Sequence, residues 1–356
     1  MVLDASVTVP ALPQQSSSSY QAASLINPST QRPGVCGLNN SGNSCYLNAV
    51  LQCLCSTVPL VEHLLNQETR KELASCRVAE IFVGLLEDMW LGRSSSCAPV
   101  EAKSVLCSIL PQFNNYLQQD AQELLLSLLN TLHDNLKKVH CDNRKSKSLS
   151  VDSTIVSHLF EGQLSYRTLC MHCNYQTHST QTFTVLSIPI PPAIIKCSLE
   201  DCLSLFFERT VLTGGEQMLC SVCGLRRETG VLTCLEKPPE ILMLHLKRFG
   251  RKGKNQVKLR TNVAFSMKLD LTPFVSSSVQ STSYSSYRLY AVVVSHLNMG
   301  HYTALCHNAL SQTWHSFDDL VVREVQDSLV QSPNAYLLLY SRKRFQKPKI
   351  HGLGAL

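Results

Sequence analysis

The chain has 356 residues, 44% of them hydrophobic, which is enough for one large domain or two ordinary domains with a substantial core. Charged residues make up only 16%, and a formal net charge of +6 is too small to indicate a nucleic-acid partner. No stretch reaches the apolar length of a membrane-spanning helix, so we expect no membrane partner either.

Residues 1–33 are rich in serine, glutamine, alanine and proline, and this composition predicts a disordered leader. The leader does not resemble a secretory signal, so the 16 cysteines are most simply reduced thiols, metal ligands or a nucleophile. We therefore expect a protein of the cytoplasm or the nucleus. Order should begin near residue 34 and end near residue 342, followed by a basic tail, 343–356, of the kind that is usually a solvated end.

A loop rich in glycine and asparagine leads directly into Cys45, within the sequence GLNNSGNSCYLNAVLQCL. After this cysteine, apolar residues recur at the spacing of one helical face: Leu47, Val50, Leu51 and Leu54. The pattern predicts a helix that begins at Cys45, where free N–H groups and the macrodipole favour a thiolate nucleophile. The alternative is a small buried cysteine that packs beneath a helix.

Further helices are predicted at 79–91 and at 120–138, and the second has a wide apolar face made of leucines. Residues 141–150 are polar and basic, which favours a loop. Beyond residue 151 the pattern changes to short strands, which we expect at 162–169, 180–188, 240–249, 287–296, 301–307, 314–317 and 335–341. Helices followed by a sheet indicate the α+β class.

His301 stands out among the 12 histidines because it begins a predicted strand directly after a small turn that ends at Gly300. The missing side chain at Gly300 would let a substrate backbone approach closely. The next strand ends in two acids, and an acid at the far end of one antiparallel strand can reach a histidine at the near end of its neighbour. Cys45, His301 and either Asp318 or Asp319 are therefore candidates for nucleophile, base and orienting acid.

Attack on a carbonyl also requires hydrogen-bond donors for the oxyanion. The backbone N–H of Cys45 and the side-chain amides of Asn39, Asn40 and Asn43 are the candidates close to the thiol. The alternative role for these asparagines is turn formation, because asparagine tolerates left-handed backbone conformations.

Two Cys-x-x-Cys pairs, Cys170 with Cys173 and Cys220 with Cys223, supply four soft ligands for tetrahedral zinc. Their separation requires the intervening segment to fold back. We predict one structural zinc site, with free thiols or a redox pair as the alternatives. His172 could replace one cysteine, although its place inside a pair favours a solvated spacer.

Together these motifs resemble the ubiquitin-specific protease family of deubiquitinating cysteine peptidases, over about residues 34–342. The segment around Cys45 resembles the family's cysteine box, and QQDAQELLLSLLNTLH, which begins at Gln118, resembles its acidic helix. The segment PPEILMLHLKRF resembles the strand before the ubiquitin-facing loops. The segments GHYTALCHN, WHSFDD and AYLLLYSR resemble the histidine box.

This resemblance implies a papain-like fold shaped as a right hand, with a thumb at about 34–140, fingers and part of the palm at about 160–250, and the rest of the palm at about 250–342. It implies thiol-dependent hydrolysis at the C-terminal glycine of ubiquitin, with ubiquitin and ubiquitinated proteins as partners of a monomeric enzyme. Zinc would lie at the fingertips. The alternatives are an inactive ubiquitin-binding scaffold, a protease for another modifier that ends in Gly-Gly, and a zinc-dependent interaction module.

Position by position, the resemblance implies that Cys45 is the nucleophile, His301 the general base and Asp318 the orienting acid. Asn40 falls where the family places its oxyanion side chain.

The helix that contains Asp120 and Glu123 would line the channel for ubiquitin's tail, together with Gly300. Ordinary charge at a helix N-terminus is the alternative for the two acids. Met299 replaces the first glycine of the usual pair before the histidine, and could narrow the loop over the tail.

Overall fold

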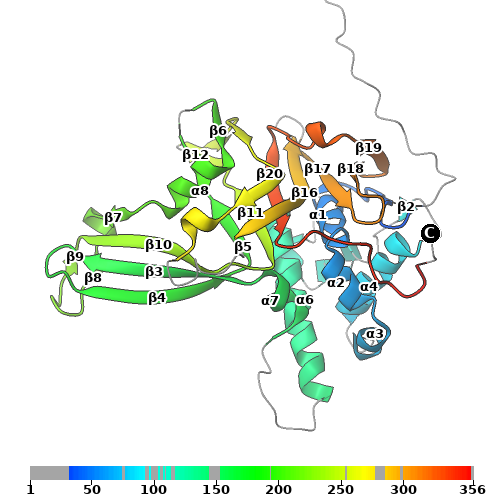
Figure 1. Cartoon of the computed structure of the whole chain (residues 1–356), viewed down its shortest axis with the longest axis horizontal. Coiled ribbons are helices and arrows are strands. Elements are labelled where there is room, and N and C mark those ends of the chain that lie inside the picture. Colours follow the sequence, from blue (N-terminus) through cyan, green and yellow to red (C-terminus); the bar gives the residue numbers. More distant parts are fainter. Residues whose placement is uncertain are drawn as a thin grey trace, which may run out of the picture.

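The computed structural model describes residues 32–73, 77–92, 96–97, 103–104, 107–108, 110–113, 117–143, 153–192, 194–252, 255–276, 285–296 and 300–353. Helices gather at one side of the molecule, a large sheet lies in the middle, and a long narrow sheet extends to the other side (Figure 1). Met299 and nearly all of the expected leader lie outside the described residues.

The helical part comes mostly from the first half of the chain: α1 (Cys45–Cys55), α2 (Val58–Leu64), α3 (Gln67–Leu73), α4 (Arg77–Trp90), α6 (Ala121–Asn143) and α7 (Ile155–Phe160). Every residue of α1 is buried, and α1 packs against α2, α6 and the central sheet. The expected loop at 141–150 begins later than its polar composition indicated, because α6 continues through Asn143.

Two short elements complete the helical part. Strand β1 (Gly37–Leu38) pairs in parallel with β2 (Ser96–Cys97) just before the cysteine loop. The turn η1 (Pro111–Phe113) stacks the Phe113 ring on Tyr46 of α1, with 6.2 Å between ring centroids.

The central sheet has the strand order β19-β18-β17-β16-β20-β11-β5, and β15 (Lys268–Asp270) also pairs with β16. Its strands are β5 (Val185–Ile188), β11 (Ile241–Leu246), β16 (Ser286–His296), β17 (His301–Asn308), β18 (Thr313–Asp318), β19 (Val321–Val325) and β20 (Ala335–Ser341). All seven residues of β20 are buried. Leu337 and Leu339 join the core beneath the helices, whereas Leu338 and Tyr340 join a second core on the opposite face. This sheet therefore separates two hydrophobic cores.

The long narrow sheet has the order β4-β3-β10-β7, from β3 (Gly162–Cys170), β4 (Gln176–Phe183), β7 (Thr210–Leu212) and β10 (Thr229–Lys237). A hairpin of β8 (Met218–Leu219) and β9 (Arg226–Arg227) lies at its outer end (Figure 1). The single strand expected at 180–188 is divided at Thr184. The part before Thr184 is mostly exposed and belongs to the narrow sheet, whereas β5 is half-buried to buried in the central sheet.

Helix α8 (Leu199–Phe207) packs in the second core and was not among the predicted elements. Its start carries a capping box, in which the Ser198 hydroxyl accepts the Asp201 N–H and the Asp201 carboxylate accepts the Ser198 N–H. The remaining strands are β6 (Lys196–Ser198), paired with β14 (Asn262–Ala264), and the hairpin β12 (Phe249–Lys252) with β13 (Asn255–Lys258).

The segment after β20 returns to the helical half, where the sequence indicated only a solvated basic end. Its Phe345 ring packs edge-on against Tyr290 at 4.8 Å, and Ile350 is buried in the helical core. The backbone N–H of Lys349 donates to Glu62 of α2 at 2.6 Å. Apolar residues placed between the basic ones therefore anchor this segment across the sheet and the helices.

Among the described residues, no single helix is long and apolar enough to cross a membrane. Helices α1 and α2 together have the length and apolar composition of a span. However, one is bent by 84° relative to the other, and both lie largely within the core.

Candidate active site and metal centre

Cys45 is the first residue of α1, as the pattern of apolar residues predicts, and Ser44 is the N-cap. The cysteine is only 2% exposed. Its Sγ atom nevertheless accepts a hydrogen bond from the side-chain amide of Gln118, at 3.3 Å. The thiol therefore lies at the edge of the core, with a polar neighbour beside it. Sequence reasoning did not single out Gln118, although it begins the QQDAQE motif.

His301 and Asp318 come together at the ends of two paired strands. Strands β17 and β18 are antiparallel, with Ala304 opposite Phe317, so the start of β17 lies beside the end of β18. The Nε2 atom of His301 is 2.6 Å from the Oδ1 atom of Asp318. Because Nε2 is held by the carboxylate, Nδ1 is the ring nitrogen left to exchange a proton with a substrate or a nucleophile.

Gln118 also connects the thiol to the histidine loop. Gly300 has a φ of +57°, and a Cβ atom added there would lie 3.8 Å from the Cγ atom of Gln118. The same side chain thus touches the Cys45 thiol and lies against the residue before His301. Together with the packing of α1 on β17, this contact places the thiol and the histidine on the two sides of one small site.

Asp319 is hydrogen-bonded to the helical half, although its carboxylate also lies within 4.8 Å of a His301 ring nitrogen. Its Oδ2 atom accepts a hydrogen bond from Asn40 Nδ2 at 2.9 Å, and its Oδ1 atom accepts one from Asn48 Nδ2 at 2.7 Å. Its own φ is +50°, in the left-handed region. The neighbouring acids therefore have different hydrogen-bond partners, since Asp318 contacts the His301 ring and Asp319 accepts two amides of the helical half.

Asn40 is oriented by its contacts on both sides. Its Oδ1 atom accepts the backbone N–H of Ser44 at 3.2 Å, and a backbone N–H can only donate, so Nδ2 must be the atom that faces Asp319. An amide nitrogen carries two N–H groups, and one remains for an oxyanion. Asn43 has a φ of +48°, which fits the alternative role in the turn. The backbone carbonyl of Asn39 accepts a hydrogen bond from the Asn48 side chain.

Asp120 serves as a helix cap. Its Oδ1 atom accepts the backbone N–H of Gln122 at 2.7 Å, and its Oδ2 atom accepts the Tyr336 hydroxyl at 2.6 Å. Burial and this carboxylate raise the pKa of the Tyr336 hydroxyl well above its ordinary value, so the tyrosine stays a donor. Asp120 thereby fastens the start of α6 to β20, and Glu123 lies exposed on the next turn of the helix.

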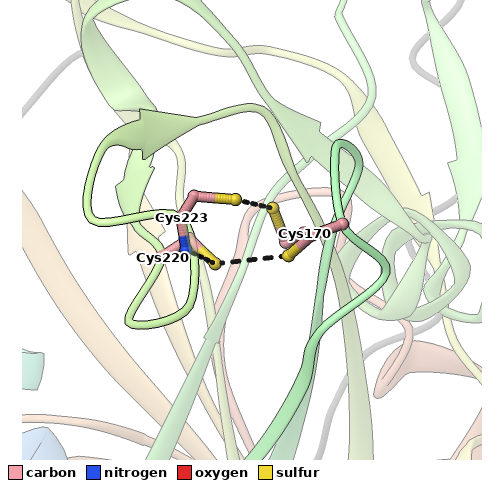
Figure 2. Close-up of side chains that lie close together, drawn as sticks. Cys170, Cys220 and Cys223 are labelled. Atoms are coloured by element: carbon pink, nitrogen blue, oxygen red, sulfur yellow. Dashed lines mark hydrogen bonds between the residues drawn. The ribbon is translucent and has the colours of Figure 1, made fainter.

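The ligand atoms of the four cysteines in the two pairs lie within 4.8 Å of one another. Figure 2 shows Cys170 facing Cys220 and Cys223 across the gap between their two turns. One pair follows β3, and the other lies in the turn between β8 and β9. Cys170 Sγ is 3.9 Å from Cys223 Sγ, and Cys173 Sγ is 3.6 Å from Cys220 Sγ. Tetrahedral ligands at the usual zinc–sulfur length of about 2.3 Å lie about 3.8 Å apart, so the four thiols fit this geometry.

The thiols of this cluster differ in acidity. Backbone N–H groups of Cys173 and His172 lower the pKa of the Cys170 thiol to about 6. A hydrogen bond with the Cys173 side chain, followed by burial, raises the pKa of the Cys223 thiol to about 12. Two groups of side chains among the described residues have ligand atoms close enough to hold a metal: the four cysteines, and His301 with Asp318 and Asp319. Four soft thiolates are the typical ligands of structural zinc, and His172 is an exposed residue beside them.

A helix that begins at a cysteine, beside a histidine–aspartate pair on a sheet, defines the class of cysteine peptidases. The family model described as ubiquitin carboxyl-terminal hydrolase matches residues 36–340. The chain therefore belongs to the ubiquitin carboxyl-terminal hydrolase family, in agreement with its resemblance to ubiquitin-specific proteases.

Individual relatives agree with the family. Ubiquitin carboxyl-terminal hydrolase 2 of Rattus norvegicus is 33% identical over 336 residues, which cover 86% of this chain and 54% of the rat protein. The protein of the same name from Gallus gallus is 37% identical over 337 residues, 86% of this chain and 93% of the chicken protein. The chain thus spans about half of the length of the rat relative.

Solved structures show the same fold. A chain of the SAGA DUB module of Ubp8, Sgf11, Sus1 and Sgf73 bound to monoubiquitin superposes with a TM-score of 0.74 at 22% identity, covering 89% of this chain and 71% of that chain. The expected α+β architecture is thereby confirmed, with a helical thumb, a palm formed by the central sheet, and fingers formed by the narrow sheet.

We predict that Asp318→Asn slows alkylation of Cys45 by iodoacetamide at neutral pH at least about tenfold. The histidine loses the carboxylate that orients it, and an oriented base contributes roughly 10²–10⁴-fold to proton transfer. The measurement is the rate of modification of the Cys45 peptide by mass spectrometry. Asp319→Asn is the matched control and should change this rate less than about twofold, because the carboxylate hydrogen-bonded to His301 is that of Asp318. Equal slowing in both variants would contradict the division of roles.

Proposed function

We propose that this protein is a deubiquitinase, which hydrolyses isopeptide or peptide bonds at the C-terminal glycine of ubiquitin. The observation that carries the proposal is the convergence of Cys45, the His301–Asp318 pair and the Asn40 amide in one member of this family. The names of the relatives and the ubiquitin-bound state of the similar solved structure support ubiquitin as the partner. We place the enzyme as a monomer that acts on ubiquitinated proteins or ubiquitin chains.

The reaction begins when His301 takes the proton of the Cys45 thiol at Nδ1, and Asp318 stabilises the imidazolium through Nε2. The thiolate attacks the carbonyl carbon of ubiquitin's last glycine and forms a tetrahedral intermediate. The Asn40 amide and the backbone N–H of Cys45 donate to its oxyanion. His301 then protonates the leaving lysine amine as the carbon–nitrogen bond breaks, which leaves a thioester.

Hydrolysis completes the cycle. His301 takes a proton from water, and the resulting hydroxide adds to the thioester carbonyl at the same oxyanion site. The carbon–sulfur bond breaks, the Cys45 thiolate leaves, and ubiquitin is released with a free carboxylate. We place the ubiquitin tail along Gly300, Asp120 and Glu123, where a missing side chain and two carboxylates suit a close backbone and basic side chains.

The cysteine cluster is the site for one zinc ion, held by Cys170, Cys173, Cys220 and Cys223. Four thiolates form a closed structural site, so the metal supplies a cross-link between the β3 turn and the β8–β9 hairpin and no chemistry. The sulfur separations and the absence of disulfides among the described cysteines support this assignment.

Two other functions remain as outcomes of the tests. An inactive ubiquitin-binding scaffold would keep the fold and the fingers, but the intact catalytic groups and their contacts count against it. A protease for another modifier that ends in Gly-Gly would keep the same chemistry with a different partner.

The function is tested with ubiquitin that carries a C-terminal propargylamide, an electrophile that reacts only with a catalytic thiol in place. We expect one covalent adduct by mass spectrometry, lost in Cys45→Ala and retained in Cys234→Ala, a cysteine of the narrow sheet. The absence of an adduct, or an adduct that persists in Cys45→Ala, would refute the hydrolase. The same electrophile can be attached to another modifier that ends in Gly-Gly. If that probe reacts in preference to the ubiquitin probe, the partner is the other modifier and not ubiquitin.

For the metal, we expect about one equivalent of zinc per chain in protein purified without chelators, measured by mass spectrometry of the element. Cys220→Ser removes one of the four ligands and should lower the zinc content well below half of the wild-type value. Cys234→Ser is the control and should retain it. Protein that contains no zinc when purified in this way would exclude the site.

A further inference from the structure

Lys103 contacts the loop that joins the two donors of the oxyanion site. Its ammonium group donates to two consecutive backbone carbonyls, those of Ser41 and Gly42, at 3.0 Å each. The loop runs from Asn40 to Cys45, so both carbonyls lie between the side-chain donor and the backbone donor. Lys103 comes from the segment between β2 and η1, which is far from this loop in the sequence.

The ends of the loop are held by contacts within it. The Ser41 N–H donates to the Ser44 hydroxyl at 2.9 Å, and the Ser44 N–H donates to Asn40 Oδ1 at 3.2 Å. These hydrogen bonds join the start of the loop to its end. In the middle of the loop, the carbonyl of the peptide between Gly42 and Asn43 accepts a hydrogen bond from Lys103.

This peptide is the strained part of the loop. Gly42 has a φ of +85° and Asn43 a φ of +48°, so two left-handed residues follow each other. Rotation of the peptide plane by half a turn would return Asn43 to the extended region that residues with a side chain prefer, and Gly42 accepts either state. The rotated loop would turn the Gly42 carbonyl away from Lys103 and change the path between Asn40 and Cys45.

Cys107 and Phe113, which follow Lys103 in the sequence, connect to α1. The Cys107 thiol donates to the Phe113 carbonyl at 3.2 Å, and the Phe113 ring stacks on Tyr46, the residue after the nucleophile. The Lys103 ammonium group opposes rotation of the Gly42–Asn43 peptide, because hydrogen bonds from a charged donor are about twice as strong as neutral ones.

We propose that Lys103 is a positioning residue for acyl transfer, which holds the Gly42–Asn43 peptide in the orientation that keeps the Asn40 amide and the Cys45 N–H aimed at one oxyanion. The inference rests on the proposed deubiquitinase function. It requires that Lys103 affects the step in which negative charge develops on the carbonyl oxygen, and neither the reactivity of the thiol nor the binding of ubiquitin.

The test compares Lys103→Met with wild type on a fluorogenic amide of the ubiquitin C-terminus. We expect kcat to fall at least about tenfold, since loss of one oxyanion donor costs roughly 10²–10³-fold. KM and the rate of Cys45 alkylation by iodoacetamide should stay within about twofold, because neither involves an oxyanion. Lys138→Met, an exposed lysine of α6, is the matched control and should match wild type in all three.

A second substitution tests the rotation itself. Asn43→Gly removes the preference of residue 43 for negative φ, so it should restore part of the kcat of Lys103→Met, and Lys103→Arg should retain most of the activity.

An unchanged kcat in Lys103→Met, a loss confined to KM, or equal loss of the alkylation rate would overturn the inference. So would an Asn43→Gly substitution that restores nothing in the Lys103→Met background. Wild-type protein that does not turn over ubiquitin would refute the proposed function instead, so the two failures are distinguishable. If Lys103→Met does not fold, Lys103→Gln takes its place in the test. Its amide can still donate to one of the two carbonyls, so we expect a kcat between those of wild type and a variant without the donor.

Discussion

The carboxylate of Asp319 joins the two halves of the proposed catalytic centre, and the geometry of the oxyanion site depends on this junction. Its oxygens accept the side-chain amides of Asn40 and Asn48, at 2.9 Å and 2.7 Å, and its backbone carbonyl accepts an N–H from β1. The helical half thus holds one residue of the sheet at three points. Asp318, the adjacent residue, contacts His301 separately through its own Oδ1 atom.

The rest of the fold brings the ends of rigid elements to this point. Cys45 is the first residue of α1, His301 the first of β17 and Asp318 the last of β18. The strands of the sheet separate two hydrophobic cores and α1 is buried in one of them, so the elements are fixed by packing along their length. The short connections near the site carry the left-handed residues, Asn43, Gly300 and Asp319, whose conformations are held by the surrounding hydrogen bonds.

Local sequence patterns were sufficient for the parts of the molecule that depend on neighbours in the chain. The helix start at Cys45, the strands around His301, and the cysteine pairs are of this kind, because periodicity and spacing report local geometry directly. The capping box of α8 is a local pattern as well. Ser198 and Asp201 would have been sufficient to predict the start of this helix, which the sequence analysis did not include.

Contacts between distant segments were beyond reach of those patterns. Gln118 touches the thiol, and Lys103 touches the cysteine loop, only because helices and sheet pack in one arrangement. The different contacts of Asp318 and Asp319 depend on the strand register, which the sequence alone left open.

The most direct test of the junction is a double-mutant cycle of Asn40→Ala and Asp319→Asn, measured as kcat/KM on a ubiquitin C-terminal amide. We expect each single change to cost about 100-fold and the double variant to be little worse than either, because Asp319 acts mainly through the Asn40 amide. Costs that multiply in the double variant would show that the two residues act independently and would contradict the junction.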